Sequence, residues 1–497
     1  MSREKEKFYI TTSIMYTNSP PHIGFAFESI QADVIARYHR FLGEDVFFLT
    51  GTDEHGTKVA KAAEEAGKNP KEFVNEISKK VMELKEILNL SNNDFIRTTD
   101  QKRHWPAVRK VWLKLKEAGD IYKKKYQGFY CSGCEAFITK KDLVDGKCAI
   151  HQIEPEAIEE ENYFFKLSRY SKQIADAIEK NKLKVVPETR KNEILSFIKQ
   201  GLEDVSFSRP RENLRWGIPV PDDETQTIYV WADALTNYIS AIGYFEESEK
   251  FKKLWPADVH CIGKDILRFH AAIWPGMLLS LKLPLPKTIF VHGFITVGGQ
   301  KMSKSLGNII DPLELVRKYG TDAVRYFLLR EIPSTEDGDF TYEKFEKRYN
   351  SDLAAGLGNL VARVITLAAR SNSKFQMGPS RRLGGWWEGW SPNSKQIPNL
   401  KFQTIINKTW ENWKNALDNF KFNEALVSIW DLISFCDGYI EKERPWEKSN
   451  KQLSIINDLL SVLANISQFL QPFLPETSEK ILKQIKTKKP EILFPRK

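Results

Sequence analysis

The 497-residue sequence has few of the features that mark membrane-bound or secreted proteins. No apolar run approaches the ~20 residues that a membrane-spanning helix requires. The N-terminus, MSREKEK, lacks the apolar core of a secretory signal peptide and is not an Arg- and Ser-rich amphipathic leader. Five cysteines are too few for a disulfide framework, and three of them cluster. We therefore expect a cytoplasmic protein.

The sequence also lacks internal repeats and long low-complexity segments. Hydrophobic residues make up 41% and charged residues 28%, which is typical of a globular protein, and the length allows several domains. The formal net charge of +9 fits a polyanionic partner, although a solvated basic surface is the simpler explanation.

Predicted strands and helices alternate up to about residue 115. FYITTSI (Phe8–Ile14) and EDVFFLTGTDEHG are rich in β-branched and aromatic residues, which favours strands, and helical apolar spacing follows each of them. This alternation predicts an α/β fold with a Rossmann-type parallel sheet. Ligands bind at the carboxyl ends of such strands. The residues expected at those ends are Tyr16, His22, Gly24 and Asp53.

The pattern changes between about residues 116 and 228. Cysteines, short strands and acidic turns (IEPEAIEEEN) indicate an insertion. TIYVWADALTNYISAIGY and DVHCIGKDILRFHAAIWPGML then resume the alternation, and KTIFVHGFITVGGQKMSKSLGN predicts a last strand with a hairpin turning at Gly298–Gly299. After about residue 351 the pattern is mostly helical. A Gly-, Trp- and Pro-rich connector at 376–394 interrupts it, and an exposed loop is its simplest interpretation.

The stretch PHIGFAFES (Pro21–Ser29) lies where the first predicted strand turns into a helix. A helix N-terminus offers unpaired N–H groups and a partial positive charge, which suits a phosphate. Gly24 would let a nucleotide approach the backbone closely. An ordinary turn is the alternative, and this stretch alone does not decide between them.

Two further motifs carry chemistry. Cys131 and Cys134, followed by Cys148 and His151, have the ligand spacing of a tetrahedral zinc site, and four protein ligands would make it structural. Reduced buried cysteines are the alternative. The loop Lys301-Met-Ser-Lys304-Ser305 can close on a pyrophosphate and place ammonium charge where negative charge develops, unless it is only a solvated basic loop.

Together, the His-Ile-Gly turn and the Lys-Met-Ser-Lys-Ser loop resemble the two signatures of class I aminoacyl-tRNA synthetases. The resemblance is specific to the methionyl-tRNA synthetase family. It extends, in family order and spacing, over TTSIMYTNSPPHIGF, FFLTGTDEHG, the Cys/His knuckle, YVWADALTNY, HCIGKDILRFH, VHGF, KMSKSLGN and LGNLVAR. It implies a methionine–tRNA ligase that uses ATP, with Mg²⁺ to neutralise the departing pyrophosphate.

The resemblance also assigns site residues. It places the catalytic groups at His22, Gly24, Lys301 and Lys304, and the ribose of ATP at Gly263 and Asp265. It places the methionine ammonium at Asp53 and the Ile14 backbone. The thioether would lie among Ile14, Tyr16, Trp231, Ala234, Leu235, Tyr238, Ile266, Phe269 and His270. Without the resemblance, an aromatic face buried as plain core would be the default interpretation.

The helical C-terminal part resembles the family's anticodon-binding bundle. Asn359 and Arg363 share one helix face, and Trp446 matches the tryptophan that stacks on an unpaired anticodon base; the triplet would be CAU. Asn359 as a helix cap and Trp446 as a core residue are the alternatives. The resemblance divides the chain into the following ranges: 1–115 and 229–296 as the two catalytic halves, 116–228 as the zinc insertion, 297–350 as the region of the signature loop and stem contacts, and 351–497 as the anticodon-binding domain.

The sequence departs from the family pattern at Phe25, where the signature usually has a second histidine. Either a neighbouring group or backbone N–H compensates, or the enzyme is slow, because losing one transition-state donor costs ~3 kcal/mol. The chain ends at ILFPRK without the dimerising domain that some members append, so we expect a monomer. A cysteinyl or leucyl enzyme, or a weakened tRNA-binding relative, remains an alternative.

Overall fold

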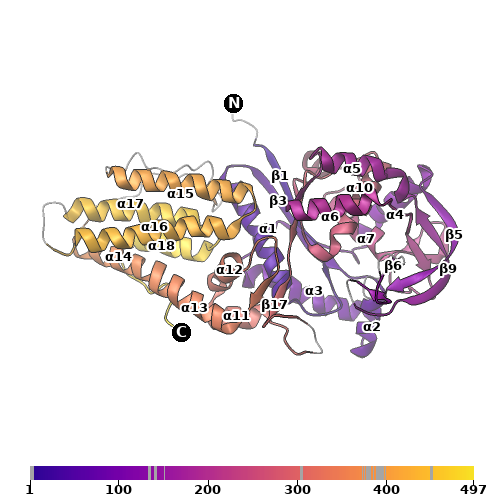
Figure 1. Ribbon diagram of the computed structural model, residues 1–497, viewed down its shortest axis with the longest axis horizontal. Coiled ribbons are helices and arrows are strands. Elements are labelled where there is room, and N and C mark those ends of the chain that lie inside the picture. The colour runs from indigo at the N-terminus through magenta and orange to yellow at the C-terminus, as the bar shows by residue number, and fades with distance from the viewer. Residues whose placement is uncertain are drawn as a thin grey trace.

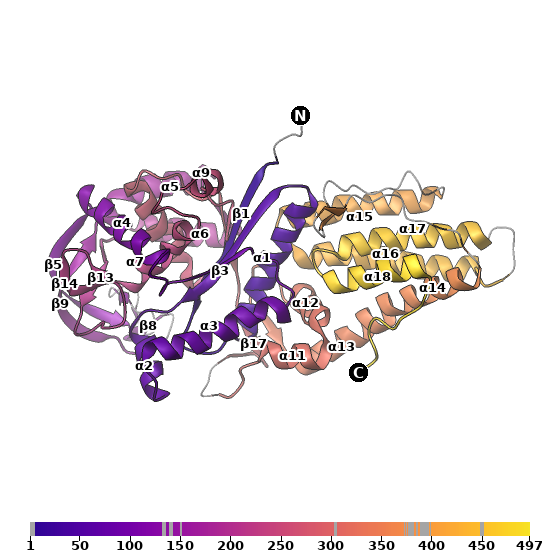
Figure 2. The same ribbon diagram turned by 180° about the vertical axis from the view of Figure 1, so that it is seen from behind.

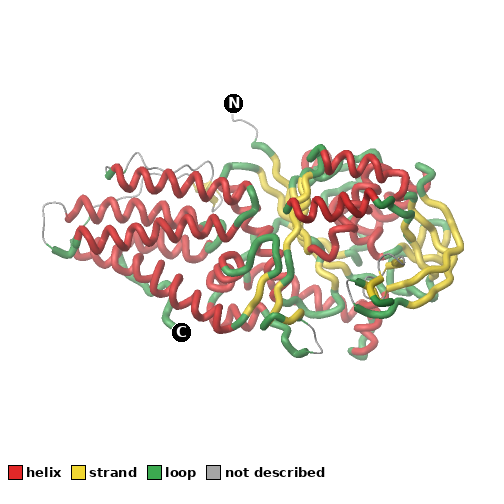
Figure 3. The backbone as a smooth tube through the Cα atoms, viewed as in Figure 1, coloured by secondary structure: helices red, strands yellow, loops and turns green. Residues whose placement is uncertain are grey.

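The computed structural model describes residues 5–131, 136–138, 143–149, 152–302, 306–371, 373, 375, 382–383, 386–387, 397, 399–447 and 452–497. This part of the chain is elongated, with a helical bundle at one end and the long strands β5 and β9 at the other (Figures 1 and 2). The main sheet lies between them (Figure 3).

The main sheet is parallel throughout, as the sequence predicted. Its strands are β1 (Lys7–Thr12), β2 (Met15–Tyr16), β3 (Asp45–Asp53), β4 (Asp94–Arg97), β10 (Lys184–Val186), β15 (Val259–Gly263) and β16 (Thr288–His292). The order is β10-β16-β15-β1-β3-β2, and β4 also pairs with β3. The strand order reverses between β1 and β15, and ligands bind at such a switch point in doubly wound sheets.

Both faces of this sheet are buried, which explains its continuous apolar strands. Phe8 and Ile10 of β1 contribute to one core cluster, whereas Tyr9 between them contributes to the other. Phe290 and Ile289 of β16 alternate in the same way. The helices that cover the sheet and connect its strands are α1 (Ile23–Phe41), α2 (Thr57–Glu65), α3 (Pro70–Ile87), α4 (His104–Glu117), α5 (Ser171–Glu179), α6 (Glu188–Lys199), α7 (Val230–Leu235), α8 (Asn237–Ser240), α9 (Glu249–Leu254) and α10 (Trp274–Ser280).

The sequence predicts a turn at the acidic stretch IEPEAIEEEN, and this prediction is wrong. The stretch enters β9 (Glu156–Phe165), which pairs antiparallel with β5 (Ile121–Cys131). Opposite charges face each other across the pair, as at Lys125 and Glu161, and such pairs stabilise a sheet. The remaining strands of this region are β6 (Ala136–Ile138), β7 (Leu143–Val144), β8 (Lys147–Cys148) and β11 (Val205–Ser206).

The strand in TIYVWADAL also differs from expectation. The alternation favoured a place in the parallel sheet, but β14 (Asp223–Ile228) pairs antiparallel with β12 (Ser208–Pro210) and β13 (Pro219–Val220). The reason is local, because only a tight turn separates β13 from β14, and a tight turn can join only antiparallel strands. The helix α7 follows as predicted.

The helical end confirms the predicted C-terminal architecture. Its elements are α11 (Pro312–Tyr319), α12 (Thr321–Arg330), α13 (Tyr342–Arg348), a π-helix (Tyr349–Gly358), α14 (Asn359–Arg370), α15 (Leu400–Asp418), α16 (Phe422–Glu443), α17 (Gln452–Leu470) and α18 (Pro475–Thr487). A small sheet contains β17 (Ile295–Val297), β18 (Gln300–Lys301) and β19 (Gly338–Phe340), and β19 lies between α12 and α13 in the chain. Most of the 376–394 connector lies outside the described residues, apart from β20 (Arg382–Leu383) and β21 (Trp386–Trp387).

Two helical stretches among the described residues are long and apolar enough to cross a membrane by length and composition, Tyr342–Arg370 and Gln452–Leu470. The absence of long apolar runs in the sequence predicts none. Both belong to the helical end, and 72% of the apolar window in Gln452–Leu470 is buried inside the molecule. A buried core helix passes the same test, so this is weak evidence for a membrane span.

Candidate active site

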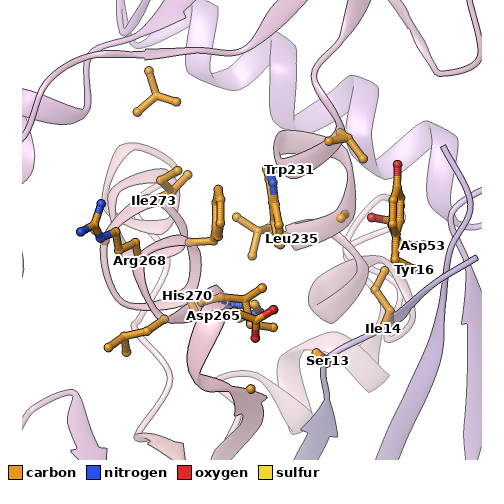
Figure 4. A pocket seen from close by; sticks show the side chains of 18 of the residues that line it. Ser13, Ile14, Tyr16, Asp53, Trp231, Leu235, Asp265, Arg268, His270 and Ile273 are labelled. Atoms are coloured by element: carbon orange, nitrogen blue, oxygen red, sulfur yellow. Dashed lines mark hydrogen bonds between the residues drawn. The ribbon is translucent and has the colours of Figure 1, made fainter. Parts of the chain in front are cut away.

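A cavity of about 1210 Å³ opens at the carboxyl ends of β1, β3, β15 and β16, beside the switch point. It brings together the predicted methionine and ATP residues that the structure describes. They are Ile14, Tyr16, His22, Gly24, Asp53, Trp231, Ala234, Leu235, Tyr238, Gly263, Asp265, Ile266, Phe269, His270 and Lys301. Figure 4 shows Tyr16 and Asp53 on one side and Asp265 and His270 on another. Lys304 lies outside the described residues.

His22 caps helix α1. Its Nδ1 accepts the Gly24 N–H at 3.0 Å, so the neutral ring carries its proton on Nε2. Burial lowers the pKa of His22, which favours this neutral form. A Cβ on Gly24 would lie 2.8 Å from Cε1 of His22, so a larger residue here would displace the ring from its capping position.

The helix start differs from the expectation of unpaired N–H groups. The Ile23 N–H donates to the Ile310 carbonyl, the Gly24 N–H to His22, and the Phe25 N–H to the His22 carbonyl. The prediction was therefore wrong for these three donors. A phosphate here would meet the positive end of the helix and the His22 ring rather than backbone donors.

The apolar part of the cavity is built from α7, α8 and the segment after β15. The rings of Trp231 and Phe269 stack with centroids 3.6 Å apart. His270 Nδ1 lies 2.9 Å from the Ile266 carbonyl, and His270 Nε2 lies 2.7 Å from the Tyr238 hydroxyl. Because a carbonyl can only accept, Nδ1 donates and Nε2 accepts from Tyr238. Burial lowers the pKa of His270 to about 4, so this wall is neutral.

A carboxylate anchors the polar side of this pocket. Asp53 ends β3, is 8% exposed and pairs in register with Tyr16. Behind it, Asp233 on α7 accepts hydrogen bonds from His55 Nδ1 and His104 Nε2, each at 2.7 Å. This buried cluster ties α7 to the loop after β3 and so fixes the helix that carries Trp231.

Glu28 and His292 are among the residues of this cavity that were not predicted from the sequence. Glu28 is 4% exposed on a face of α1 that is otherwise largely apolar, and His292 ends β16. A single carboxylate within an apolar helix face was the available signal. Pattern alone could not show that the two residues form a pair, because the chain brings α1 and β16 together only in the folded state.

The basic loop begins as predicted. Val297 pairs with Gln300 across Gly298 and Gly299, whose φ values of 60° and 75° are those of a hairpin turn that favours glycine. Lys301 follows at the cavity, with Nζ 5.6 Å from the centre of the Phe294 ring. Residues 303–305 of the motif lie outside the described part of the chain.

The predicted zinc ligands are described only in part. Cys131 ends β5 and Cys148 ends β8, and both are buried in one small cluster with Phe129 and Leu143. The structure therefore brings together one member of each predicted ligand pair. Cys134 and His151 lie outside the described residues, within which no group of three metal-ligating side chains occurs.

The predicted anticodon residues are accessible. The helix continues through Gly358 into Asn359, with helical φ and ψ at Gly358, so Asn359 does not begin a helix as a cap would. Trp446 is 48% exposed, which removes the core interpretation. Arg363 donates to Glu441 at 2.6 Å, near the end of α16 and shortly before Trp446 in the chain.

Comparison with known proteins decides the family. A family model described as "tRNA synthetases class I (M)" matches residues 8–149 and 132–365, and one described as "Anticodon-binding domain of tRNA ligase" matches residues 401–495. A protein named "Methionine--tRNA ligase" from Caldanaerobacter subterraneus subsp. tengcongensis is 42% identical over 520 residues, which cover 99% of this chain and 79% of that protein. This chain belongs to the methionyl-tRNA synthetase family.

Other methionyl-tRNA synthetases match over most of their length. A protein named "Methionine--tRNA ligase" from Rickettsia conorii is 42% identical, and the match covers 98% of this chain and 94% of that protein. The Mycobacterium tuberculosis methionyl-tRNA synthetase in complex with methionyl-adenylate aligns with a TM-score of 0.87 at 36% identity, covering 99% of this chain and 98% of that one. Its apo form aligns with a TM-score of 0.82 at 33% identity, covering 100% and 99%.

Proposed function

We propose that the protein is a methionine–tRNA ligase, which activates methionine with ATP and transfers it to tRNA(Met). The observation that carries this is the cavity at the switch point, where an aromatic pocket, a buried carboxylate and the histidine-capped helix meet. The direct test is ATP–pyrophosphate exchange with each amino acid in turn. Exchange with methionine alone supports the proposal, and no exchange with any amino acid contradicts it.

In the proposed first step, the methionine carboxylate attacks the α-phosphorus of ATP in line, and pyrophosphate leaves. Asp53 binds the methionine ammonium, and the stacked Trp231 and Phe269 face the thioether, because sulfur packs well against aromatic rings. Gly263 and Asp265 bind the ribose. The Nε2–H of His22 and the ammonium groups of Lys301 and Lys304 stabilise the charge that develops on the phosphates.

Magnesium bound to the phosphates would neutralise pyrophosphate as it leaves. In the second step the 2′-hydroxyl of the terminal adenosine attacks the activated carbonyl. No side chain of this protein forms a covalent bond, so its contribution is positioning and charge stabilisation. The alternatives are a weakened tRNA-binding relative or another class I synthetase, and the exchange assay separates them from the main proposal.

We also propose a structural zinc ion held by Cys131, Cys134, Cys148 and His151. Cys131 and Cys148 lie buried in the same small cluster, which supports this proposal because two thiolates supply half of the ligands of a tetrahedral site. We expect about one zinc per chain in the purified protein, measured by emission spectrometry. Cys148→Ser should lose it, while Cys436→Ser, which changes a buried cysteine of α16, should keep it. Zinc-free wild-type protein with unchanged thermal stability would contradict the proposal.

The anticodon site is proposed at Asn359, Arg363 and Trp446, reading CAU. Trp446→Ala should lower kcat/KM for tRNA charging by roughly 10–100-fold, because base stacking contributes ~1–3 kcal/mol. Pyrophosphate exchange should stay unchanged, since the bundle lies at the far end of the molecule from β5 and β9 and outside the cavity (Figure 2). A parallel fall in both activities would show that the assignment of this domain is wrong.

Phe25, in place of the usual second histidine, packs against the apolar cluster of Met15, Ile77 and Val81. Because the first N–H groups of α1 already have acceptors, we propose that neighbouring side chains rather than the backbone compensate. Phe25→His should then leave kcat for exchange within about threefold of wild type. A rise of more than about tenfold would show instead that the natural enzyme is slow.

We also propose three wider properties of the protein. The protein is a monomer in the cytoplasm, and its domains follow the ranges 1–115, 116–228, 229–296, 297–350 and 351–497. Light scattering at micromolar concentration tests the first, and a mass twice that of one chain would contradict it. The ranges give the order of the regions along the chain rather than exposed joints, because 115–116 falls within α4, 296–297 within β17 and 350–351 within the π-helix.

A further inference from the structure

A buried ion pair joins helix α1 to the end of β16 inside the cavity. His292 Nε2 lies 2.8 Å from Glu28 Oε2, and His292 Nδ1 lies 2.7 Å from the Gly293 carbonyl oxygen. When Glu28 is ionised both partners can only accept, so the ring donates from both nitrogens and is positively charged. Burial alone would lower the pKa of His292, but the hydrogen bond to Glu28 helps to outweigh it and the net shift is upward.

The other oxygen of Glu28 holds the turn after β1. Glu28 Oε1 accepts the Ser13 N–H at 2.7 Å and the Ser13 hydroxyl at 2.6 Å. Ser13 directly precedes Ile14, which lines the cavity and whose backbone is the proposed partner of the methionine ammonium. Glu28 therefore connects His292 to the methionine side of the site.

His292 also borders the proposed nucleotide side. A Cβ built on Gly263 would lie 3.7 Å from His292 Cε1 and 2.8 Å from Asp265 Oδ1, so these three residues surround the same point. The Phe27 ring packs against the His292 ring at close to a right angle, with the two centroids 5.5 Å apart. The pair thus lies between the Ser13–Ile14 turn and the ribose-binding residues.

We infer that Glu28 and His292 are positioning residues for adenylate formation, which hold the Ser13–Ile14 turn in register with Gly263 and Asp265. This inference rests on the proposed function. Both protons of His292 are engaged by acceptors, so it does not donate to a phosphate as His22 is proposed to do. Its task is to align the methionine carboxylate with the α-phosphate, and misalignment slows a reaction even when both substrates bind.

The test uses the full chain with His292→Leu, Glu28→Gln and the double variant. Each single variant should lower kcat for methionine-dependent exchange by about 30-fold or more, while the Kd for methionine alone, measured by tryptophan fluorescence, changes less than about threefold. The kcat of the double variant should be about the same as that of the slower single variant, because both substitutions disrupt the same Glu28–His292 interaction. His292→Gln, which keeps a donor for Glu28, should recover about tenfold over His292→Leu.

The matched control is a second His–Glu pair, formed by His39 of α1 and Glu44 shortly after the end of that helix. His39 Nδ1 lies 2.9 Å from Glu44 Oε2, and neither residue lines the cavity, so His39→Leu should leave exchange unchanged. Unchanged kcat in His292→Leu, additive losses in the double variant, or loss of methionine binding in step with kcat would each overturn the inference while wild-type exchange still supports the function. If the wild-type protein fails to exchange, the proposed function itself falls.

Discussion

Replacing Asp53 with asparagine should lower kcat/KM for methionine in pyrophosphate exchange by roughly 10²–10³-fold. Removing one partner of a buried, hydrogen-bonded charge pair costs ~2–5 kcal/mol, and ~1.4 kcal/mol corresponds to a factor of ten. Asp53 is 8% exposed at the end of β3, so water cannot easily replace its carboxylate as partner of the substrate ammonium. The loss should appear mainly in KM for methionine, because the ammonium is bound before and during the reaction.

The control for this change lies on the same strand. Asp45 begins β3, and its side chain is 50% exposed where it pairs with Lys253, so Asp45→Asn should leave the exchange kinetics unchanged. A loss of less than about fivefold in Asp53→Asn would mean that another group binds the ammonium. An equal loss in both variants would point to damage of β3 rather than of the site.

The parallel sheet and its ligand-binding edge could be predicted because local signals agree with the fold. The sequences of β1, α1 and β3 each show the apolar pattern expected of a strand or a helix, and His22 marks the start of α1 within one residue. The residues at the strand ends then follow from topology alone. The other predicted residues that line the cavity came from the family resemblance rather than from the strand pattern.

The features that could not be predicted depend on which segment each strand or helix end pairs with, whether that partner is near or far along the chain. The acidic segment before Asn162 becomes a strand because the basic strand β5 lies opposite, and β14 turns away from the main sheet because it closes a hairpin with β13. The engaged N–H of Ile23 needs the carbonyl of Ile310, far along the chain. Composition gives no access to such pairings, since each exists only after folding.

A buried arginine joins the catalytic sheet to the helical end. Arg325 on α12 has no exposed surface, and its Nη2 lies 2.7 Å from Asp33 Oδ2 on α1. It also donates from Nε to the Phe473 carbonyl, from Nη1 to the Leu88 carbonyl and from Nη2 to the Pro472 carbonyl, at 2.7, 3.0 and 3.0 Å. Four of the five guanidinium N–H groups therefore have acceptors, and the side chain links α1, the loop after α3 and the loop between α17 and α18.

Arg325→Met should lower the free energy of unfolding by about 3–5 kcal/mol, measured by urea denaturation, because it leaves Asp33 and three buried carbonyls short of a donor. Arg37, which donates to Asp33 at 2.7 Å, compensates only part of this charge. In Arg444→Met the lost partner is Glu447 in an exposed ion pair, so the cost should stay below about 1 kcal/mol. Equal costs in the two variants would show that the junction contributes no more than a surface contact. A large cost with normal exchange at low temperature would mean that it stabilises the fold without shaping the site.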